Sequence, residues 1–324
     1  MRVMFSLAWL AFPAALLVNA VGGAVAQTTY PIKPIRWIVA NPPGGPGDLV
    51  ARAIGQKLSE SLDQQVLVDN RPGLHIGWGI ASKARPDGYT ITMGNATFAI
   101  HASLYSKLPY DTVKDFSPLT QAPSSPLLLV AHPSLPARSP KELIVLATSK
   151  PGQITYASSG SGSPHHLGVE LLSSMGGIKM VHVPYKGASP AVTDLLGGQV
   201  SLGIVALSAS LPHVRTGKLT ALGVTAPKRS AFAPDVPTVA ESGFPGYAVE
   251  FWMGVLAPAG TPREIVNKLS SEIVRILQTP EVKERFHSQG FEIFSSTPEQ
   301  FAAYIKEEIV KWAKVVKDSG ARTD

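Results

Sequence analysis

The sequence predicts an α/β protein whose sheets are mixed and mostly parallel. Strand-like and helix-like segments alternate from end to end of the 324 residues, as expected for parallel strands joined by helical crossovers. No long low-complexity linker interrupts this alternation. The expected strands cover residues 35–40, 65–69, 90–93, 127–131, 154–157, 180–183, 200–205, 219–224 and 249–256.

Helix starts support this reading because three segments repeat one capping pattern. Ser139–Glu142, Thr261–Glu264 and Thr297–Gln300 each place a hydroxyl residue before proline, with Glu or Gln at the third helical position. The last of them opens a helix with one apolar stripe, and its outer face is expected to be solvated. The expected stripe is Phe301, Ile305, Ile309, Trp312 and Val316, and the expected outer face is Lys306, Glu307, Glu308, Lys311 and Lys314.

Residues 1–26 have the pattern of a cleavable secretory signal peptide. An apolar run follows Arg2, and Ala24-Val25-Ala26 matches an A-x-A cleavage site, so the mature chain is expected to begin at Gln27. An uncleaved membrane anchor is the alternative, but the apolar run is shorter than the roughly 20 residues that a span needs. We therefore expect export to the periplasm.

Composition limits the function classes. The chain has no cysteine, which excludes disulfides and thiol chemistry. Without Arg2 it has 28 basic and 23 acidic residues, and no run of five Lys or Arg occurs. We therefore expect no nucleic-acid partner. The histidines show no metal-ligand spacing, and no nucleotide motif is present, so we expect no cofactor and no metal.

A proline- and glycine-rich turn follows the first expected strand. Residues 41–48 read Asn-Pro-Pro-Gly-Gly-Pro-Gly-Asp, and an amphipathic helix leaves them. A strand, tight turn and helix start direct free backbone N–H groups toward one point, which suits an anion. The alternative is a purely structural turn in which Asp48 caps the helix.

A second strand–loop–helix repeats this arrangement. Its loop, residues 158–163, reads Ser-Ser-Gly-Ser-Gly-Ser, and Pro164 opens the next helix. Small residues allow a ligand close to the backbone, and hydroxyls add neutral donors. The alternatives are a flexible loop or a serine hydrolase using Ser161 or Ser163, although no G-x-S-x-G motif occurs. We expect His166 to face and steady the loop and His165 to lie on the surface.

Motifs distributed over nearly the whole mature chain resemble the Bug family, the TctC-like extracytoplasmic solute receptors of tripartite tricarboxylate transporters. The matching segments are Tyr30-Pro31, Lys33–Arg36, Pro42–Pro46 with Asp48, Asn70–Gly73, Pro86–Thr90, Leu108–Asp111, Lys114–Phe116, Val181–Gly187, Asp194–Val200, Asp235–Val239 and Leu256–Pro262.

The resemblance implies a type II periplasmic-binding-protein fold with two lobes that close on a ligand. Lobe one would comprise residues 28–127 and 250–324, and lobe two residues 128–249, with hinges near 123–128 and 247–252. A ligand carboxylate would lie between the turn Pro43 to Asp48 and the loop Ser158 to His166. The loaded receptor, a monomer, would then dock on a membrane permease.

Departures from the family pattern affect the expected ligand. Gly47 and Pro164 stand where hydroxyl residues are common, and Phe251 replaces a small hydroxyl residue. The residues at the far end of the cleft are more apolar or aromatic than usual, which favours an aromatic acid such as a benzoate or phthalate. The expected ligand-binding residues are Pro43, Gly44, Gly45, Gly47, Asp48, His75, Trp78, Phe98, Ser158, Ser159, Gly160, Ser161, Gly162, Ser163, His166, Val205, Ala206, Phe251 and Trp252.

The function expected from these residues and this resemblance is capture of an organic carboxylate, without catalysis. One alternative is a sensory receptor that binds the same solutes and reports to a regulatory partner. The other is the serine hydrolase.

Overall fold

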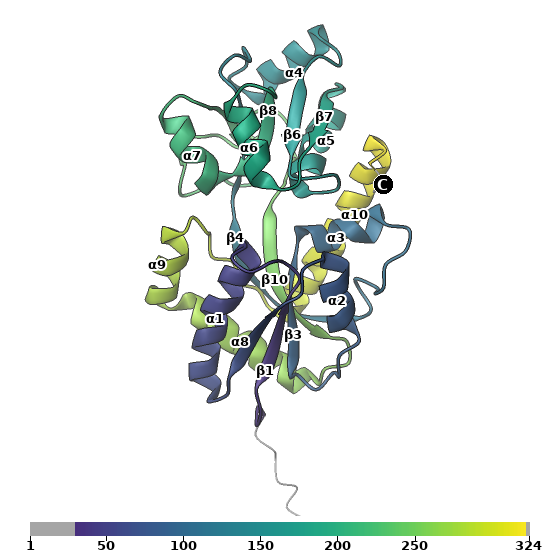
Figure 1. The fold of residues 1–324 in the computed structure, drawn as a ribbon, viewed down its shortest axis with the longest axis vertical. Coiled ribbons are helices and arrows are strands. Elements are labelled where there is room, and N and C mark those ends of the chain that lie inside the picture. Colours follow the sequence, from purple (N-terminus) through teal and green to yellow (C-terminus); the bar gives the residue numbers. More distant parts are fainter. Residues whose placement is uncertain (1–29, 322–324) are drawn as a thin grey trace, which may run out of the picture.

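The computed structural model describes residues 30–321, which form two five-stranded sheets, each flanked by helices (Figure 1). The predicted signal peptide lies outside this range. The sheets lie one above the other in the view of Figure 1, and we call each sheet with its helices a lobe. Within residues 30–321, no helix is both long and apolar enough to cross a membrane.

Lobe one contains the sheet in the order β2-β1-β3-β10-β4. β1 pairs in parallel with β2 and β3, whereas β10 runs antiparallel to both β3 and β4. Its strands are β1 (Ile35–Val39), β2 (Val66–Asn70), β3 (Thr90–Asn95), β4 (Phe116–Ser125) and β10 (Phe251–Pro258). Its helices are α1 (Pro46–Leu62), α2 (Leu74–Ser82), α3 (Ala96–Leu104), α8 (Arg263–Gln278), α9 (Pro280–Ser288) and α10 (Pro298–Ser319).

Lobe two repeats the same topology in the order β7-β6-β8-β5-β9, with β5 as its antiparallel strand. Its strands are β5 (Leu127–Ala131), β6 (Thr155–Ser158), β7 (Val181–Pro184), β8 (Leu202–Ala206) and β9 (Thr220–Val224). Its helices are α4 (Pro140–Ser149), α5 (Pro164–Gly176), α6 (Ala188–Leu196) and α7 (Leu207–Arg215). The predicted α/β class with mixed, mostly parallel sheets is confirmed, since four strands of each sheet share one direction.

Strand β4 was not predicted from the sequence. Pro118 and Pro123 lie inside it, and proline usually argues against a strand because it cannot donate a ladder hydrogen bond. The position of β4 at the edge of its sheet explains the exception, since one side of an edge strand needs no donors.

The three predicted helix caps have different outcomes. At α10 the full capping box forms between Thr297 and Gln300. At α4, Ser139 accepts the N–H of Glu142, but the Glu142 carboxylate accepts from the Arg138 N–H instead of closing the box on Ser139. The prediction at α8 was wrong: Pro262 is the N-cap there, and the Thr261 hydroxyl donates to the Pro258 carbonyl at 2.7 Å.

The chain passes between the lobes through Pro126, between β4 and β5, and through Glu250, just before β10. Buried Thr225 joins the two passages. Its hydroxyl lies 3.2 Å from the Leu127 carbonyl oxygen and 2.6 Å from that of Val249, and the Val249 N–H donates to the Thr225 carbonyl. These bonds fix the separation of the two passages on the lobe-two side.

Helix α10 packs on lobe one through a buried stripe that includes Phe301, Ile305 and Trp312. The prediction that Glu308 lies on the outer face was wrong, because its side chain is 5% exposed. Its carboxylate accepts the indole N–H of both Trp252 and Trp312 at 2.9 Å and pairs with Lys311. Two buried indole donors need an acceptor, and one carboxylate serves both.

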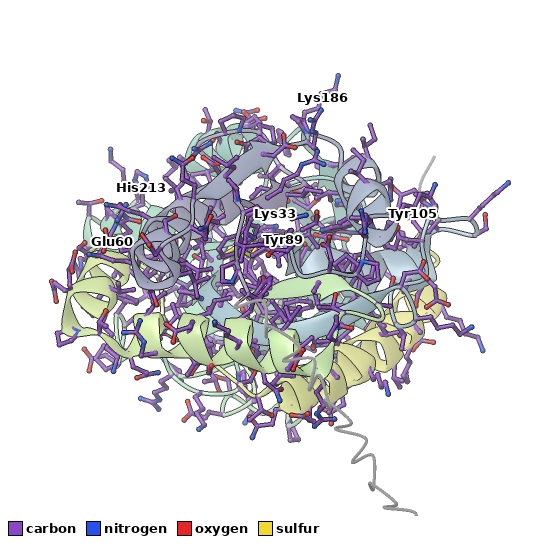
Figure 2. All side chains as sticks on the ribbon, turned by 90° about the horizontal axis from the view of Figure 1, so that it is seen from below. Lys33, Glu60, Tyr89, Tyr105, Lys186 and His213 are labelled. Carbon is purple, nitrogen blue, oxygen red and sulfur yellow. The ribbon has the colours of Figure 1, made fainter. Side chains whose placement is uncertain are left out.

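The segment before β1 is attached to the lower end of lobe one. The Tyr30 hydroxyl donates to the Gly88 carbonyl at 2.6 Å, and Lys33 Nζ lies 4.2 Å above the centre of the Tyr89 ring. Figure 2 shows Lys33 and Tyr89 together near the middle of this end of the molecule. The described chain therefore begins as an ordered part of lobe one.

Gly254 provides a test of the α10 packing. A Cβ atom at this position of β10 would lie 2.1 Å from Phe301 Cζ, whereas one at Gly197 would meet nothing nearer than 3.5 Å. We expect Gly254→Ala to lower the free energy of unfolding in urea by about 1–3 kcal/mol through overpacking. Gly197→Ala, at a φ of −80°, is the control. Equal effects of the two variants would contradict this account of the packing.

Candidate functional site

The first turn lies between β1 and α1, and its residues differ in exposure. Pro43 and Gly44 are exposed, Gly45 is half-buried, and Gly47 and Asp48 are buried. Gly44 has a φ of +82°, which glycine adopts without strain. The alternative in which Asp48 caps the helix was wrong in that detail, since Gly45 is the N-cap and Asp48 lies in the first turn of α1.

Asp48 instead holds the turn in place. Its carboxylate, 2% exposed, accepts the Gly44 N–H at 2.9 Å, the Asn70 amide at 2.9 Å and the Arg52 guanidinium at 3.0 Å. Burial raises the pKa of Asp48, but these hydrogen bonds and the charge of Arg52 outweigh burial and leave the pKa below its ordinary value. The turn is thus tied both to α1 and to the end of β2.

Backbone donors remain free in this turn. Among the described residues, no acceptor is found for the N–H groups of Gly45, Gly47 and Asp48. The first N–H groups of a helix have no partner within the helix, and no side chain caps α1. These donors and the positive end of the α1 dipole favour a negative group at this position.

The second loop lies between β6 and α5 and is cross-linked by its own serines. Ser163 is the N-cap of α5: its oxygen accepts the His166 N–H at 3.2 Å, and its hydroxyl donates to the Gly160 carbonyl at 2.7 Å. Ser158, buried at the end of β6, accepts the Gly160 N–H at 3.1 Å. The described chain offers no acceptor for the N–H groups of Ser159, Ser161 and His165.

His166 steadies this loop, as predicted. Its Nδ1 accepts the Gly162 N–H at 3.1 Å, so the ring is neutral and carries its proton on Nε2. Burial, with a smaller contribution from His182, lowers the pKa of His166 to about 3. The two rings stack at 3.9 Å, and His182 Nε2 lies 2.7 Å from the Ser158 hydroxyl.

His165 is half-buried, so the prediction of a surface residue was wrong. Its Nδ1 lies 2.8 Å from the Ser159 hydroxyl, and its ring centre is 6.4 Å from that of half-buried Phe251 at the start of β10. A cavity of about 10 Å³ beneath the loop is bounded by Ser159, His165 and Val205 among others, and it holds one water at most. Ala206, at the end of β8, is half-buried.

Three of the expected aromatic contacts lie in the core. Trp78 and Phe98 are 0% exposed and Trp252 is 1% exposed. Trp78 donates its indole N–H to the Met93 carbonyl at 2.8 Å, and its ring meets Phe98 edge-on at 5.0 Å. His75 is half-buried beside His101 and Tyr105, at ring separations of 4.6 and 4.3 Å. Among the aromatic residues that were expected to contact the ligand, Phe251 is the one that is partly exposed and lies beside the second loop.

The described residues contain no pairing of Ser161 or Ser163 with a histidine ring. The Ser163 oxygen is engaged as the helix cap, and Ser161 is exposed. Histidine rings contact Ser158 and Ser159 instead. No group of three metal-ligating side chains occurs within residues 30–321. The hydrolase alternative with Ser161 or Ser163 as nucleophile therefore lacks the serine–histidine contact that it requires in the described chain.

The lobes touch where the second loop meets α3. A Cβ atom at Gly162, whose φ is +73°, would lie 2.1 Å from Leu104 Cδ2. Sequence reasoning missed this contact, and it also missed Arg52, Asn70 and His182. Sequence reasoning could have identified Asn70 and His182, because His182 lies on a predicted strand and Asn70 directly follows one. These strands run parallel to β1 and β6, beside the turns that follow β1 and β6.

Comparison with known proteins agrees with this arrangement. The model of the "Tripartite tricarboxylate transporter family receptor" (TctC) matches residues 50–321. The protein BugT of Bordetella pertussis is 39% identical over 306 residues, covering 93% of this chain and 94% of BugT.

Solved structures show the same fold. Rpa4515 of R. palustris with adipate has a TM-score of 0.77 and 35% identity, covering 90% of this chain and 99% of that one. MatC (Rpa3494) of Rhodopseudomonas palustris with bound malate has a TM-score of 0.73 and 31% identity, covering 89% and 100%. The chain therefore belongs to the TctC, or Bug, family of periplasmic solute-binding receptors.

Proposed function

We propose that this receptor captures a small organic carboxylate between its two turns and delivers it to the permease of a tripartite tricarboxylate transporter. The observation that carries the proposal is the pair of strand–turn–helix units with free backbone donors, one in each lobe. We further propose that the protein acts as a monomer, exported by a cleaved signal peptide.

Neutral donors suit a carrier that must release its cargo. In the proposed complex, the carboxylate accepts hydrogen bonds from Gly45 and Gly47 on one side and from Ser159 and Ser161 on the other. Arg52, which reaches the first turn, is already paired with Asp48. Binding through N–H and hydroxyl groups avoids desolvating a fixed charge, so the affinity stays moderate and the ligand can leave.

Closure of the lobes would complete the site. The proposed lobes are residues 28–127 with 250–324, and residues 128–249, hinged at 123–128 and 247–252. The contact of Gly162 with Leu104 is then a contact of the closed form. Ligand binding favours whichever state joins both sets of donors, and the closed form offers the permease a surface that the open form lacks.

The ligand class is inferred from family members of known structure and from one aromatic side chain, not from the free donors of the turns. Two family members of known structure hold adipate and malate, which favours a carboxylate for this chain. An aromatic acid is the narrower proposal, and it now depends on Phe251 beside His165. Trp78, Phe98 and Trp252 are left out of the proposed contact set because their side chains are buried in the core.

Thermal unfolding of the mature chain against a panel of acids tests the ligand class. The panel contains adipate, malate, citrate, benzoate and the phthalate isomers. A ligand at 100 times its Kd adds about 2.7 kcal/mol of stability, which is a readily measured rise in Tm. We expect at least one acid to raise the Tm. If no acid does so, the carboxylate proposal is wrong.

Phe251→Leu separates the aromatic proposal from the general one. If an aromatic ring stacks on Phe251, we expect the variant to weaken benzoate or phthalate binding by about 0.5–1.5 kcal/mol and to leave adipate unchanged. Titration calorimetry measures both affinities. An equal change for both acids, or none for either, contradicts the aromatic contact and leaves the carboxylate site standing.

The role given to Asp48 predicts a pH-dependent loss of stability. Asp48→Asn removes charge-assisted hydrogen bonds, so we expect a loss of about 1.5–3 kcal/mol at pH 7. Because the pKa of Asp48 is lower when folded than its ordinary value of 3.8, this stabilisation is present above pH 3.8 and disappears as the pH falls below it.

Urea unfolding at pH 7 and at pH 2.5 checks this expectation, with exposed Asp235→Asn as the control. The difference between wild type and Asp48→Asn should narrow at the lower pH. A difference of equal size at both pH values would show that the carboxylate charge does not hold the turn.

Gly162→Ala tests the closed contact. Alanine at Gly162 or at Gly152 must adopt a positive φ, +73° or +69°, but only at Gly162 does the new methyl group meet Leu104. We expect both variants to lose about 1–2 kcal/mol of stability from backbone strain. Only Gly162→Ala should weaken the binding of whichever acid the panel identifies.

Calorimetry on Gly162→Ala with Leu104→Ala completes this test. Removing the Leu104 side chain should restore part of the lost affinity. Weakened binding in Gly152→Ala as well, or no rescue in the double variant, would contradict a closed form built on this contact.

A further inference from the structure

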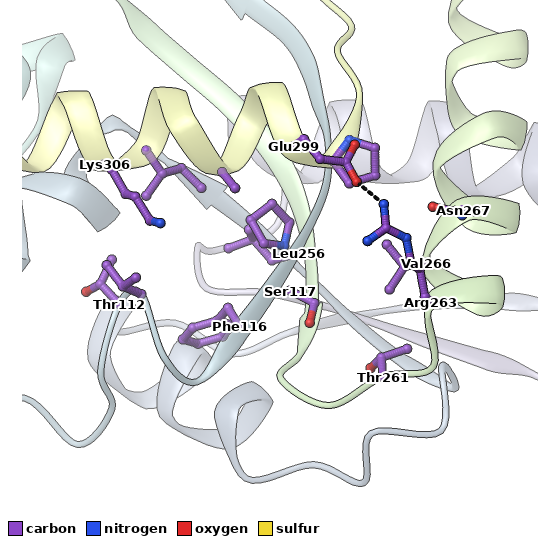
Figure 3. Close-up of a pocket in the computed structure, with 15 residues that line it drawn as sticks. Thr112, Phe116, Ser117, Leu256, Thr261, Arg263, Val266, Asn267, Glu299 and Lys306 are labelled. Carbon is purple, nitrogen blue, oxygen red and sulfur yellow. Dashed lines mark hydrogen bonds and ion pairs between the residues drawn. The ribbon is translucent and has the colours of Figure 1, made fainter.

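A second cavity of about 400 Å³ opens on lobe one, away from the two turns. It lies between the start of α10, the start of α8 and the paired strands β4 and β10 (Figure 3). Volumes of about 300–1,000 Å³ are typical of sites for small ligands. The cavity is therefore large enough for a molecule of ten or more heavy atoms.

The cavity is separate from the proposed carboxylate site. Leu256 lines it and lies five residues after Phe251 along β10, which at about 3.3 Å per residue is roughly 17 Å. Phe116, at the first residue of β4, also lines it, whereas the passage to lobe two follows Ser125 at the last. Both strands thus place the cavity at the end of the lobe-one sheet that is farther from lobe two.

The walls are amphipathic. Phe116, Leu256, Val266 and Ile305 supply a buried apolar surface. Figure 3 shows Lys306 and Thr112 at one end of the cavity, and Arg263 with Glu299 at the other. The Arg263 guanidinium pairs with the Glu299 carboxylate at 2.7 Å, which spans the rim toward α8.

Two polar groups at the first end lack partners in the described chain. Lys306 takes part in none of the ion pairs found within residues 30–321. Thr112 is 6% exposed, and its hydroxyl oxygen is buried without a hydrogen bond. That oxygen has no surface open to the cavity, so the polar group that a ligand can reach at this end is the ammonium of exposed Lys306.

We propose that this cavity binds an amphipathic monocarboxylate, with its apolar chain on Phe116 and Leu256 and its carboxylate at Lys306. The charged lining groups are Arg263, Lys306 and Glu299, so the formal charge is two positive minus one negative, or +1. That charge suits a monoanion better than a di- or tricarboxylate. The unpaired Lys306 ammonium donates to the carboxylate at that end of the cavity.

The test uses octanoate as the probe, with octanol as its neutral counterpart. Titration calorimetry on the mature chain measures both, with adipate present and absent. Ala302→Trp fills the cavity from α10, whereas Ala303→Trp adds the same side chain on the exposed face of that helix, outside the lining. We expect at least a tenfold loss of octanoate affinity in Ala302→Trp and no change in Ala303→Trp.

Lys306→Gln keeps the shape of the cavity and removes its free charge, and exposed Lys317→Gln is its control. We expect a loss of about fivefold for octanoate and none for octanol in Lys306→Gln, the size of one partly exposed ion pair. No octanoate binding, displacement of octanoate by adipate, or equal effects of Ala302→Trp and Ala303→Trp would overturn the proposal. Absence of binding by every acid of the panel, with octanoate still bound, would count against the carboxylate cleft and leave this cavity in place.

Discussion

The paired passage between the lobes is the constraint on which the rest of the structure depends. Thr225 bonds to both Leu127 and Val249, the residues that flank the two passages on the lobe-two side. On the lobe-one side, the Met253 N–H donates to the Ser124 hydroxyl at 3.3 Å. Each lobe repeats one strand order around the passing strand, so fixing these passages directs the turns after β1 and β6 toward the space between the sheets.

The two turns solve one structural problem with different chemistry. In each, a side chain four residues ahead accepts a glycine N–H: Asp48 accepts from Gly44, and His166 from Gly162. The first acceptor is a carboxylate neutralised by Arg52, and the second is a neutral imidazole whose pKa of about 3 keeps it uncharged near neutral pH. Both arrangements fix a glycine-containing turn without adding net charge, so the free N–H groups define the electrostatics of the site.

Sequence patterns identified the fold class, nine of the strands and both turns because periodicity, capping residues and glycine placement are local signals. They did not reveal which face of a short helix is buried. Phe98 on α3 lies in the core because two residues outside this helix pack on it: Tyr110 stacks at 5.8 Å and Phe116 meets it edge-on at 5.1 Å. Glu308 is buried for a similar reason, since its partner Trp252 comes from another element. Such tertiary pairings leave no trace in local spacing.

Helix α10 adds a third connection that any movement of the lobes must accommodate. It packs on α3 in lobe one and on α5 in lobe two, and Lys311 donates to the Ala248 carbonyl at 3.0 Å beside the second passage. Near its end, a cavity of about 340 Å³ opens beside α5, lined by both polar and apolar residues such as Glu170 and Ile178. Trp312 and Val315 of α10 belong to the same buried apolar cluster as Leu172 and Ile178 of lobe two, and an interdigitated apolar interface resists sliding. The proposed closure must therefore be a rotation that keeps α5 against α10, whose buried stripe also packs on lobe one.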